Sequence, residues 1–569
     1  MRPRNSPFQT VGIARVRRSV FNLSYDYKTT CNIGELIPVM HKECIPGDYF
    51  TVGNEMAIRL QPMMAPVFHE LNAYIHYFFV PHRLLWDKWE DFITRGKDGN
   101  FSATIPVYFG SQSDPVGSGN KYAKATGTQP KSLWDYLGYP LLDQSTINGV
   151  DIFNNPLLPR GFRQRAYNLI WYEYYRDQNL TLEWIPGRDT TADYRLMNNF
   201  FDNPDNNPNW RTMRTAVDVP IGSFIRTRCW EKDYFTSALP RQQRGNPVAL
   251  PVRGTSKAEF FGNMIGGVIG PVNPYPPAYL NNGSPPSNFG LFYDNPTSID
   301  IQNVNNNFRE RLNSNSVNLS NAVSFDISEL RLAFQIQRWM ERNMRAGVRL
   351  KEFLLSHYGV SPRDDRLQRP EYLGGTKQPI IISEVLQTSS TNTTSPQGHM
   401  TGHGISVSGK RAFKYHVKEH GTIMGILSIV PRTAYYQGIE RTEIPTNVYD
   451  YFFPEFQNLS EQEVKTGEVY LSQQTLNNPD LIFGFQGRYN EHRYSTSKIT
   501  GEFRNNLNYW HFGRRFSSIP VLNNHFVEIE NNSTPFLVKN YNQCLVQVFN
   551  QIRAVRPMVR NATPGLVDH

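Results

Sequence analysis

HELNAYIHYFFVPHRLLW, residues 69–86, combines three histidines with a high density of aromatic rings. Alternate residues divide it into two faces, as in a β-strand. One face is apolar after its first member, and the other is polar at its start and apolar at its end. The first face comprises His69, Leu71, Ala73, Ile75, Tyr77 and Phe79, and the second comprises Glu70, Asn72, Tyr74, His76, Phe78 and Val80. Pro81 then interrupts the ladder. We therefore expect a strand about 40 Å long in a large β-sandwich.

The histidines of this stretch do not match a metal-binding motif. A zinc protease carries H-E-x-x-H on a helix, and Ala73 stands where the second histidine should be. On a strand, His69 and His76 face opposite sides, so they cannot share one ion. We expect histidines that face loops or subunit contacts.

Two H-x-x-x-H pairs occur later in the chain. His416 and His420 lie in a strand-like run, where residues four apart are about 13 Å from each other, too far to bind one ion. His399 and His403 lie in a glycine-rich stretch that we interpret as a loop, where chelation stays open.

The composition of this 569-residue chain favours β-structure with large contact surfaces. Aromatic residues make up 13% and apolar residues 39%, while 40 glycines and 39 prolines indicate many turns and loops. The length allows two to four domains, or one core with large insertions. The net charge of +9 is modest for this length, so its placement matters more than its total.

The cysteines and apolar runs bear on the compartment. Cys31, Cys44, Cys229 and Cys544 match no zinc spacing and are too few for a disulfide framework, so we interpret them as free thiols in a reducing compartment. The first residues contain no apolar signal core, and no apolar run approaches the roughly 18 residues of a membrane span. We therefore expect neither a secretory signal nor a membrane helix.

The order of segments predicts one β scaffold with insertions rather than a row of separate domains. A basic arm at the start is either a disordered tail or a contact for a polyanion. The predicted segments are a basic arm (1–30), first strands (31–110), long insertions (111–325), a helical and extended-loop insertion (326–377), and remaining strands with a C-terminal segment (378–569).

Individual elements follow from periodicity and turn residues. Strands are expected within residues 45–60, 379–388, 413–431, 525–530 and 544–555. A helix is expected within 160–180, a second begins near Asp326 with Glu329 as a cap partner, and a third covers 349–358. Residues 361–375 are expected to form an extended loop with turns.

Three further motifs are weak. GISVSGKR (404–411) has Arg411 where a phosphate-binding loop needs Ser or Thr, so we expect a flexible loop that enters a strand. Glu419, Glu440 and Glu443 offer carboxylates for a glycosidase, but no separation can be read from sequence. The glycine-rich apolar stretch 262–270 is too short to span a membrane. It is either a surface or inter-subunit loop or a buried loop, with Gly262, Met264, Ile265, Gly266, Val268, Ile269 and Gly270 as its candidate residues.

Several stretches together resemble the major capsid protein of gokushoviruses, small icosahedral single-stranded DNA phages of the Microviridae. They are NIGELIPVMHKECIPGDYF (32–50), residues 69–96, LRLAFQIQRWMERNMRAG (330–347), SPRDDRLQRPEYLGGTKQPIIISEVLQTSS (361–390), HVKEHGTIMGILSIVPRTAYYQGI (416–439) and the segment around Trp510 to Phe512. RLQRPEYLGG followed by SEVLQTS is the most specific. The matches extend from about residue 20 to 555, and residues 185–320 match least.

The resemblance implies an eight-stranded antiparallel jelly roll of the viral capsid type, mainly β, with large loop insertions and a few helices. It implies a structural protein without catalytic residues or cofactors, and 60 copies in a T=1 shell around circular single-stranded DNA. The shell would form in the host bacterial cytoplasm. An insertion loop projects at the threefold axes in this family, and the resemblance implies such a surface protrusion within the long insertions (111–325). Its implied partners are other copies of itself, the genome, a small basic DNA-binding capsid protein, an internal scaffolding protein, a DNA pilot protein and a host surface receptor.

Charge arithmetic supports a separate basic protein. Sixty copies at +9 carry 60 × 9 = +540, whereas the coding sequence alone has 569 × 3 = 1,707 phosphates. The shell therefore cannot neutralise its genome unaided. We expect the arginines near the two chain ends to face the genome, namely Arg2, Arg4, Arg15, Arg17 and Arg18, and also Arg553, Arg556 and Arg560.

A second function stays open at this point. The 13% aromatic content also suits a carbohydrate-binding or carbohydrate-cleaving β-sandwich. Sugar release by a monomer would favour it, whereas particle formation would favour the capsid subunit. A capsid must also recognise its host, so we expect residues 190–320 to contact the host surface.

Overall fold

The fold was determined as a computed structural model of the whole chain. The described residues are 17–86, 88–94, 105, 129–142, 157, 159–180, 225–245, 255–257, 316–318, 327–346, 355–356, 363–364, 368–386 and 400–561. They divide into two compact units, residues 1–242 with 343–569, and residues 243–342.

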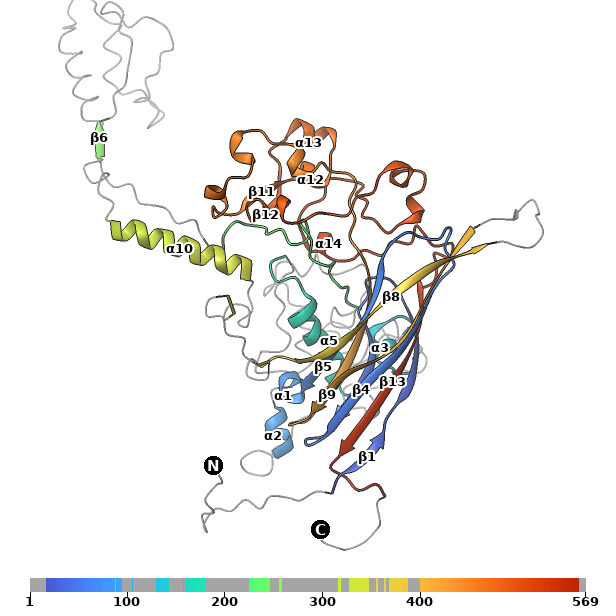
Figure 1. Cartoon of the computed structure of the whole chain (residues 1–569). Coiled ribbons are helices and arrows are strands. Elements are labelled where there is room, and N and C mark those ends of the chain that lie inside the picture. Colours follow the sequence, from blue (N-terminus) through green and yellow to red (C-terminus); the bar gives the residue numbers. More distant parts are fainter. Residues whose placement is uncertain are drawn as a thin grey trace, which may run out of the picture. The chain divides into compact units, whose positions relative to one another are not determined.

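Nine strands of the first unit form one antiparallel sheet (Figure 1). Its path runs β1-β13-β4-β9-β8-β5-β10-β3, and β2 also pairs with β13. The strands are β1 (Ser19–Asn22), β2 (Tyr25–Cys31), β3 (Ile37–Cys44), β4 (Tyr49–Leu60), β5 (Leu71–Pro81), β8 (Glu371–Leu386), β9 (Met400–His416), β10 (Gly421–Pro431) and β13 (Cys544–Arg556). Strands from both ends of the chain are thus neighbours in the sheet.

β5 confirms the strand expected in the opening stretch, and its two faces pack against different partners. The first face, from Leu71 to Phe79, lies in the main core, where most of its side chains are completely buried. The apolar end of the second face, Phe78 and Val80, lies in a separate cluster. Each side chain of this size contributes about 1.5–3 kcal/mol when fully buried, so β5 is central to the stability of both clusters.

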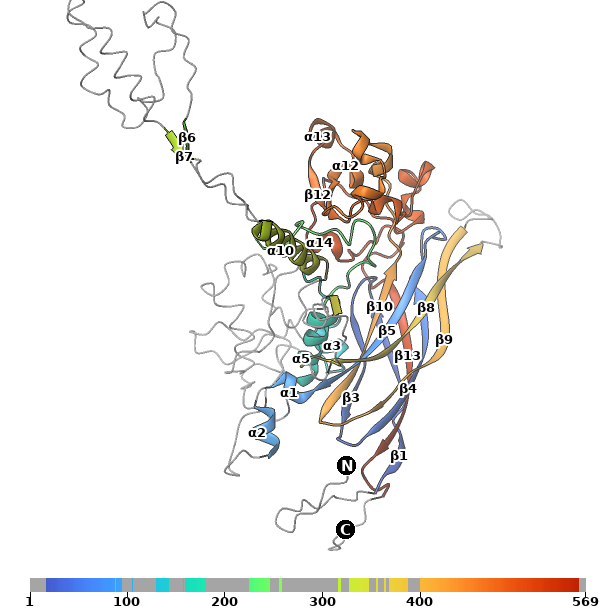
Figure 2. The same cartoon turned by 60° about the vertical axis from the view of Figure 1, so that its left-hand side comes forward.

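The main core lies between two halves of the sheet. β8 joins them, because its first part pairs with β5 and its last part pairs with β9. Val546 and Ile58 from one half and Ile75, Ile429 and Val39 from the other share one buried cluster. Figure 2 shows β4, β9 and β13 beside the half that contains β3, β5 and β10.

A buried polar contact ties the two halves together. The side-chain nitrogen of Asn54 in β4 donates hydrogen bonds of 2.9 Å to the hydroxyl of Tyr77 in β5 and to that of Thr376 in β8. All three side chains are buried. Because an unsatisfied buried polar group costs about 1–3 kcal/mol, these bonds favour one register between the halves.

Short helices cover the second face of β5. They are α1 (His82–Leu85), α3 (Leu133–Tyr136), α5 (Phe162–Ile170) and the π-helical turn η2 (Trp171–Tyr175). The helix α2 (Trp89–Thr94) has no buried residue and packs against α1 instead. Trp134, Tyr167 and Ile170 pack with Phe78 and Val80 in the second cluster. The helix expected within residues 160–180 is confirmed by α5 and η2.

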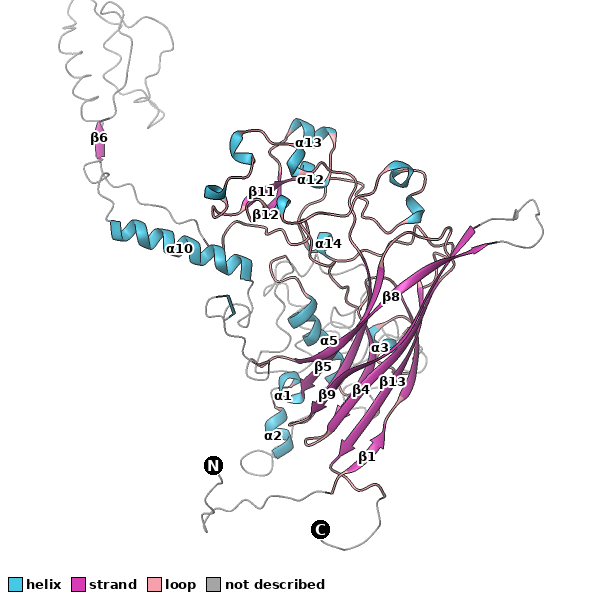
Figure 3. Cartoon of the chain, viewed as in Figure 1, coloured by secondary structure: helices cyan, strands magenta, loops and turns pink. Residues whose placement is uncertain are grey.

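Residues 432–543 form a mostly irregular region with a small core of its own (Figure 3). Its core includes Tyr435, Val464, Val469, Phe483 and Phe526. Its elements are η5 (Arg441–Glu443), η6 (Val448–Asp450), η7 (Pro454–Phe456), β11 (Gln462–Lys465), α12 (Thr466–Val469), α13 (Gln473–Asn477), β12 (Ile482–Gln486), η8 (Asn490–His492), η9 (Gly501–Arg504), η10 (Asn508–Trp510) and α14 (Asn524–Val527).

The second unit contains β6 (Thr255–Lys257) paired with β7 (Ser316–Asn318), and most of α10 (Ile327–Ala346). α10 confirms the helix expected near Asp326. Within the described parts of the chain, no helix is long and apolar enough to cross a membrane. The helix expected at 349–358 falls largely outside the described residues.

Four local expectations are wrong. His416 and His420 do not share one strand, because β9 ends at His416, the chain turns over residues 417–420, and β10 begins at Gly421. Residues 404–411 and His403 lie inside β9 rather than in a loop, because β4 and β8 pair with this segment on both sides. Residues 371–375 are the start of β8 rather than an extended loop, because β5 supplies their ladder. Residues 525–530 begin in the helix α14, because the side chain of Asn523 accepts a hydrogen bond from the backbone N–H of Phe526 and caps a helical turn.

Two glycines in the 432–543 region, Gly438 and Gly467, allow a test of how tightly this region is packed. A methyl group at Gly438 would lie 1.9 Å from the carbonyl oxygen of Glu468, whereas at Gly467 the nearest atom would be 4.0 Å away. We expect Gly438→Ala to destabilise the region by roughly 1–3 kcal/mol through overpacking, measured by thermal unfolding. Gly467→Ala, in α12, serves as the control and should leave the melting temperature unchanged or slightly higher. Equal melting temperatures for the two variants would contradict the close approach.

Candidate interaction surfaces

The histidines of the opening stretch are structural. A ring nitrogen of His69 lies 2.6 Å from the carbonyl oxygen of Arg432, and one of His76 lies 2.8 Å from the hydroxyl of Tyr175. Burial is the main cause that lowers the pKa of both imidazoles to about 4, so both are neutral at pH 7. Among the described residues, no three His, Cys, Asp or Glu side chains are arranged to hold a metal ion.

Two of the carboxylates weighed for glycosidase chemistry are held in ion pairs. Glu419 lies 2.7 Å from the guanidinium of Arg83, and Glu440 lies 2.8 Å from the ammonium of Lys498. Glu443 is an exposed residue of η5. Each carboxylate therefore stabilises a local contact or faces solvent.

The sheet brings arginines from both ends of the chain together. Ser19 of β1 is opposite Arg556 of β13, and Asn22 is opposite Arg553. Arg17 and Arg18 directly precede β1 and are exposed, as are Arg553 and Arg560. Figure 1 shows β1 beside the end of β13. We name Arg17, Arg18, Arg553 and Arg560 the basic sheet end.

Arg556 differs from its neighbours because its guanidinium is bound by other groups of the protein. One nitrogen lies 3.4 Å from the carboxylate of Asp48 and donates a 2.8 Å hydrogen bond to the carbonyl oxygen of Glu43. Asp48 is completely buried, and burial raises the pKa of its carboxyl while Arg556 opposes that shift. Arg556 therefore fastens the end of β13 to β3 and to the turn that follows it.

The pKa values of two β3 residues report a positive potential beside Arg556. Burial lowers the pKa of Lys42, and the charges of Arg556 and Arg163 lower it further. Burial also lowers the pKa of His41 to about 4, with added repulsion from Arg163 and Lys42. Lys42, Arg163 and Arg556 are therefore cations close enough to repel one another near this end of the sheet.

The remaining arginines and the glycine-rich loop cannot be placed. Arg2, Arg4 and Arg15 lie outside the described residues, and so do all candidate residues of the 262–270 loop. Their expected roles stay predictions from sequence.

A second surface, which sequence reasoning missed, is formed by exposed apolar side chains in the 432–543 region. We name it the aromatic face. Its side chains are 38–66% exposed, and they are Val448, Tyr449, Tyr451, Phe452, Phe453 and Leu459. The run VYDYFF (448–453) was the available signal, but it has no strand or helix period and therefore predicts no structural role.

The backbone of the aromatic face is held firmly while its side chains point outward. The hydroxyl of buried Tyr489 donates to the carbonyl oxygens of Tyr449 (3.2 Å) and Tyr451 (2.9 Å). Asp450 accepts hydrogen bonds from the backbone of Thr446 and Asn447. Burial alone would raise the pKa of Asp450, but these bonds lower it overall. Exposed rings on a rigid backbone lose little entropy when they become buried.

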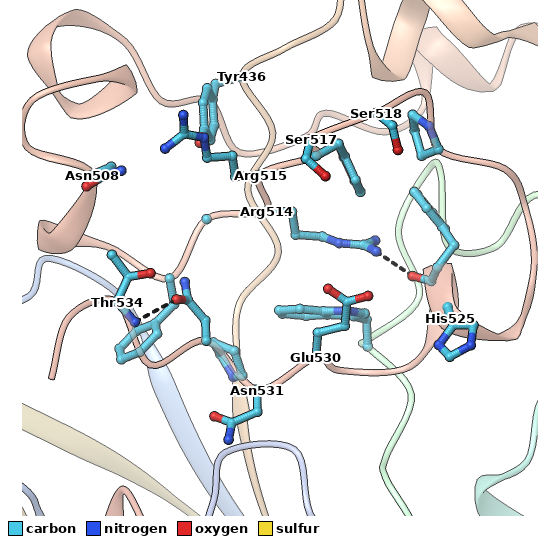
Figure 4. Close-up of a pocket in the computed structure, with 18 of the residues that line it drawn as sticks. Tyr436, Asn508, Arg514, Arg515, Ser517, Ser518, His525, Glu530, Asn531 and Thr534 are labelled. Carbon is cyan, nitrogen blue, oxygen red and sulfur yellow. Dashed lines mark hydrogen bonds between the residues drawn. The ribbon is translucent and has the colours of Figure 1, made fainter. Parts of the chain in front are cut away.

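A cavity of about 570 Å³ opens beside residues 508–534 (Figure 4). Arg514 at this cavity hydrogen-bonds to the carbonyl oxygen of Phe526 and the hydroxyl of Tyr435, and its guanidinium lies 4.1 Å from the centre of the Phe526 ring. Arg514 is therefore committed to the packing of this region. Exposed polar residues also line the cavity, among them Arg515, Ser517, Ser518 and His525.

Comparison with known proteins agrees with the resemblance seen in the sequence. The sequence model of the family described as capsid protein (F protein) matches residues 8–566. Capsid protein VP1 of Chlamydia phage 1 is 32% identical over 98% of this chain and 97% of its own length. VP1 of Bdellovibrio phage phiMH2K is 29% identical (98% and 97%), and VP1 of Spiroplasma virus 4 is 28% identical (97% and 96%). The family consists of structural proteins of the virion rather than enzymes. With a family match over nearly its whole length, this chain belongs to the capsid protein (F protein) family of the Microviridae.

Proposed function

We propose that 60 copies of this chain close into a T=1 icosahedral shell around circular single-stranded DNA, with the aromatic face buried between copies and the basic sheet end turned toward the genome. Family membership supports self-assembly into a shell. The aromatic face is the observation that carries the finer proposal. Six exposed apolar and aromatic side chains within residues 448–459, on a backbone held by hydrogen bonds, are costly in water and suit a protein interface, where aromatic residues are enriched.

The sheet supports the jelly-roll part of the proposal. A jelly roll packs two antiparallel sheets over one core. Here the halves of the sheet share one hydrophobic cluster, and β8 passes from one half to the other. We assign β3, β4, β5, β8, β9, β10, β13 and the two short strands β1 and β2, which both pair with β13, to this scaffold.

The basic sheet end supports the orientation toward DNA. Lysines and arginines that contact phosphates supply most of the sequence-independent affinity for nucleic acid. Arg556 is left out of the DNA-facing set because Asp48 and Glu43 already bind its guanidinium. Since the shell carries far fewer positive charges than the genome has phosphates, we include a small basic capsid protein as a partner. An internal scaffolding protein, a DNA pilot protein and a host receptor complete the proposed partners.

Substitution in the aromatic face tests the subunit contact. Tyr451 is 61% exposed, and its side chain contacts no other ring in the described structure. Tyr451→Asp should leave thermal unfolding of the free subunit nearly unchanged. Losing one aromatic anchor of about 2 kcal/mol per contact should reduce particle yield at least tenfold, measured by gradient sedimentation and negative-stain microscopy after expression with the partner proteins.

Tyr541, which is 68% exposed outside the aromatic face, provides the matched control. Tyr541→Asp adds the same charge and should allow normal particle formation. Normal particles from Tyr451→Asp, or an equal loss from both variants, would overturn the assignment of the aromatic face.

Substitution at the basic sheet end tests the contact with DNA. Each lost phosphate contact should reduce the slope of log affinity against log salt by about 0.7 for single strands, so Arg17→Gln with Arg553→Gln should reduce it by about 1.4. The measurement is binding of a fluorescent single-stranded oligonucleotide to the purified chain over a range of salt concentrations. Arg241→Gln with Arg515→Gln removes two exposed charges elsewhere and should leave the slope unchanged. The same change in both double variants would mean that binding follows net charge alone.

The host-contact proposal rests on sequence alone. We propose that residues 190–320 contact the host surface, with the 262–270 loop as part of that contact. Deletion of residues 262–270 should weaken phage adsorption to host cells while particles still form. Unchanged adsorption by intact particles would remove this part of the proposal.

A further inference from the structure

Two of the four cysteines are direct neighbours across the sheet. Cys31 is the last residue of β2, Cys544 is the first residue of β13, and the antiparallel register makes them Cα partners. They are separated by 513 positions in the sequence (544 − 31), so only the fold brings them together. Both are free thiols and are 1% and 0% exposed.

The geometry of such a pair fits a disulfide. Directly opposite residues on antiparallel strands have Cα atoms about 4.5 or 5.5 Å apart, and disulfides span Cα separations of about 4.4–6.8 Å. Opposite residues also point to the same face, and here both side chains enter the main core. The pKa of the Cys31 thiol is raised, first by a side-chain hydrogen bond with Cys544 and then by burial, in agreement with the proximity that the register gives.

Polar contacts on the neighbouring residues hold the two cysteines in this register. The side chain of Asn542 donates a 3.1 Å hydrogen bond to the hydroxyl of Thr30. The side-chain oxygen of Gln543 accepts a 3.0 Å hydrogen bond from the backbone N–H of Ile33. Thr30 and Ile33, which flank Cys31, are therefore bound by the two residues that precede Cys544, so little backbone movement is needed to bring the sulfur atoms to bonding distance.

We propose that Cys31 and Cys544 are a modification site that forms a cross-strand disulfide once the particle leaves the reducing cytoplasm. A low-molecular-weight disulfide, RSSR, is the oxidant. One cysteine thiolate attacks RSSR, forms a mixed disulfide and releases RS⁻, and the second thiolate then attacks the protein sulfur and releases another RS⁻. The two protein protons pass to the released thiolates, so the products are one protein disulfide and two RSH.

The position of the two cysteines determines when the disulfide forms and how it affects stability. The reducing cytoplasm keeps the thiols reduced during folding and assembly, and once they are buried they react slowly while β2 stays paired. β2 pairs only with β13 among the described strands, so fraying at its end exposes Cys31 to the oxidant. The bond would join the N-terminal strands covalently to the C-terminal strand and restrain the unfolded chain over a very long loop.

The test uses full-length protein and assembled particles, treated with oxidised glutathione or with dithiothreitol. Alkylation after unfolding should label four cysteines in reduced protein and two in oxidised protein, and peptide mapping should find Cys31 joined to Cys544. Oxidation should also raise the apparent melting temperature, and Cys31→Ala or Cys544→Ala should abolish that rise. Cys44→Ala is the matched control, because Cys44 is equally buried but its Cα partner is Gly421, and it should keep the rise.

Wild-type protein alone can decide the question if an alanine variant fails to fold. Four labelled cysteines after prolonged oxidation of the folded protein would overturn the proposal. A crosslink that involves Cys44 or Cys229 instead would also overturn it, because the register places neither opposite another cysteine. Particle assembly is not the readout, so failure here would leave the proposed shell untouched.

Discussion

The pairing of β13 with β1, β2 and β4 is the constraint on which the other features depend. A C-terminal strand inserted between N-terminal strands closes the chain on itself, and its buried face, from Cys544 to Ala554, completes the main core. The same ladder fixes residue neighbours that are hundreds of positions apart in sequence. It brings Arg553 beside β1 and Cys544 beside Cys31. Because non-local pairing of this kind has a high entropic cost, contacts such as the Arg556–Asp48 ion pair help to hold β13 in its place.

The basic sheet end and the aromatic face have opposite requirements for binding a partner. The basic sheet end consists of long, solvated side chains at strand ends, where affinity for a polyanion needs charge density rather than fixed geometry. The aromatic face needs fixed geometry, and the hydroxyl of Tyr489 supplies it by binding the backbone carbonyls of Tyr449 and Tyr451. A shell subunit requires both kinds of surface. Contacts between identical copies must repeat in one arrangement, whereas contacts with a flexible single strand need not.

Sequence reasoning succeeded where one burial pattern dominates a segment. The alternation in β13 and the two faces of β5 were readable because each face has a single environment along most of its length. It failed at residues 400–411 and 371–375, which are rich in glycines and polar residues. These segments are strands only because the adjacent strands β4 and β5 supply their hydrogen-bond partners. It also failed at residues 525–530. The apolar residues Phe526 and Val527 suggested a strand, but they are buried in a helical turn that Asn523 caps. The aromatic face could not be predicted from the sequence, because its backbone is held by Tyr489, which is distant in sequence, and its residues show no helix or strand periodicity.

The arginines show why a site is harder to read from sequence than a strand. The sequence alone does not distinguish the four arginines Arg17, Arg18, Arg553 and Arg556, and we expected all of them to face the genome. The fold separates them by what lies within reach of each guanidinium. Arg556 meets Asp48, a carboxylate that is completely buried and would be costly without a partner, so its charge is already neutralised inside the protein. Arg17, Arg18 and Arg553 extend from the same sheet end into solvent, and their charges stay available to a partner. Charge totals predict that a polyanion is bound, but only the positions of the carboxylates show which cations can bind it.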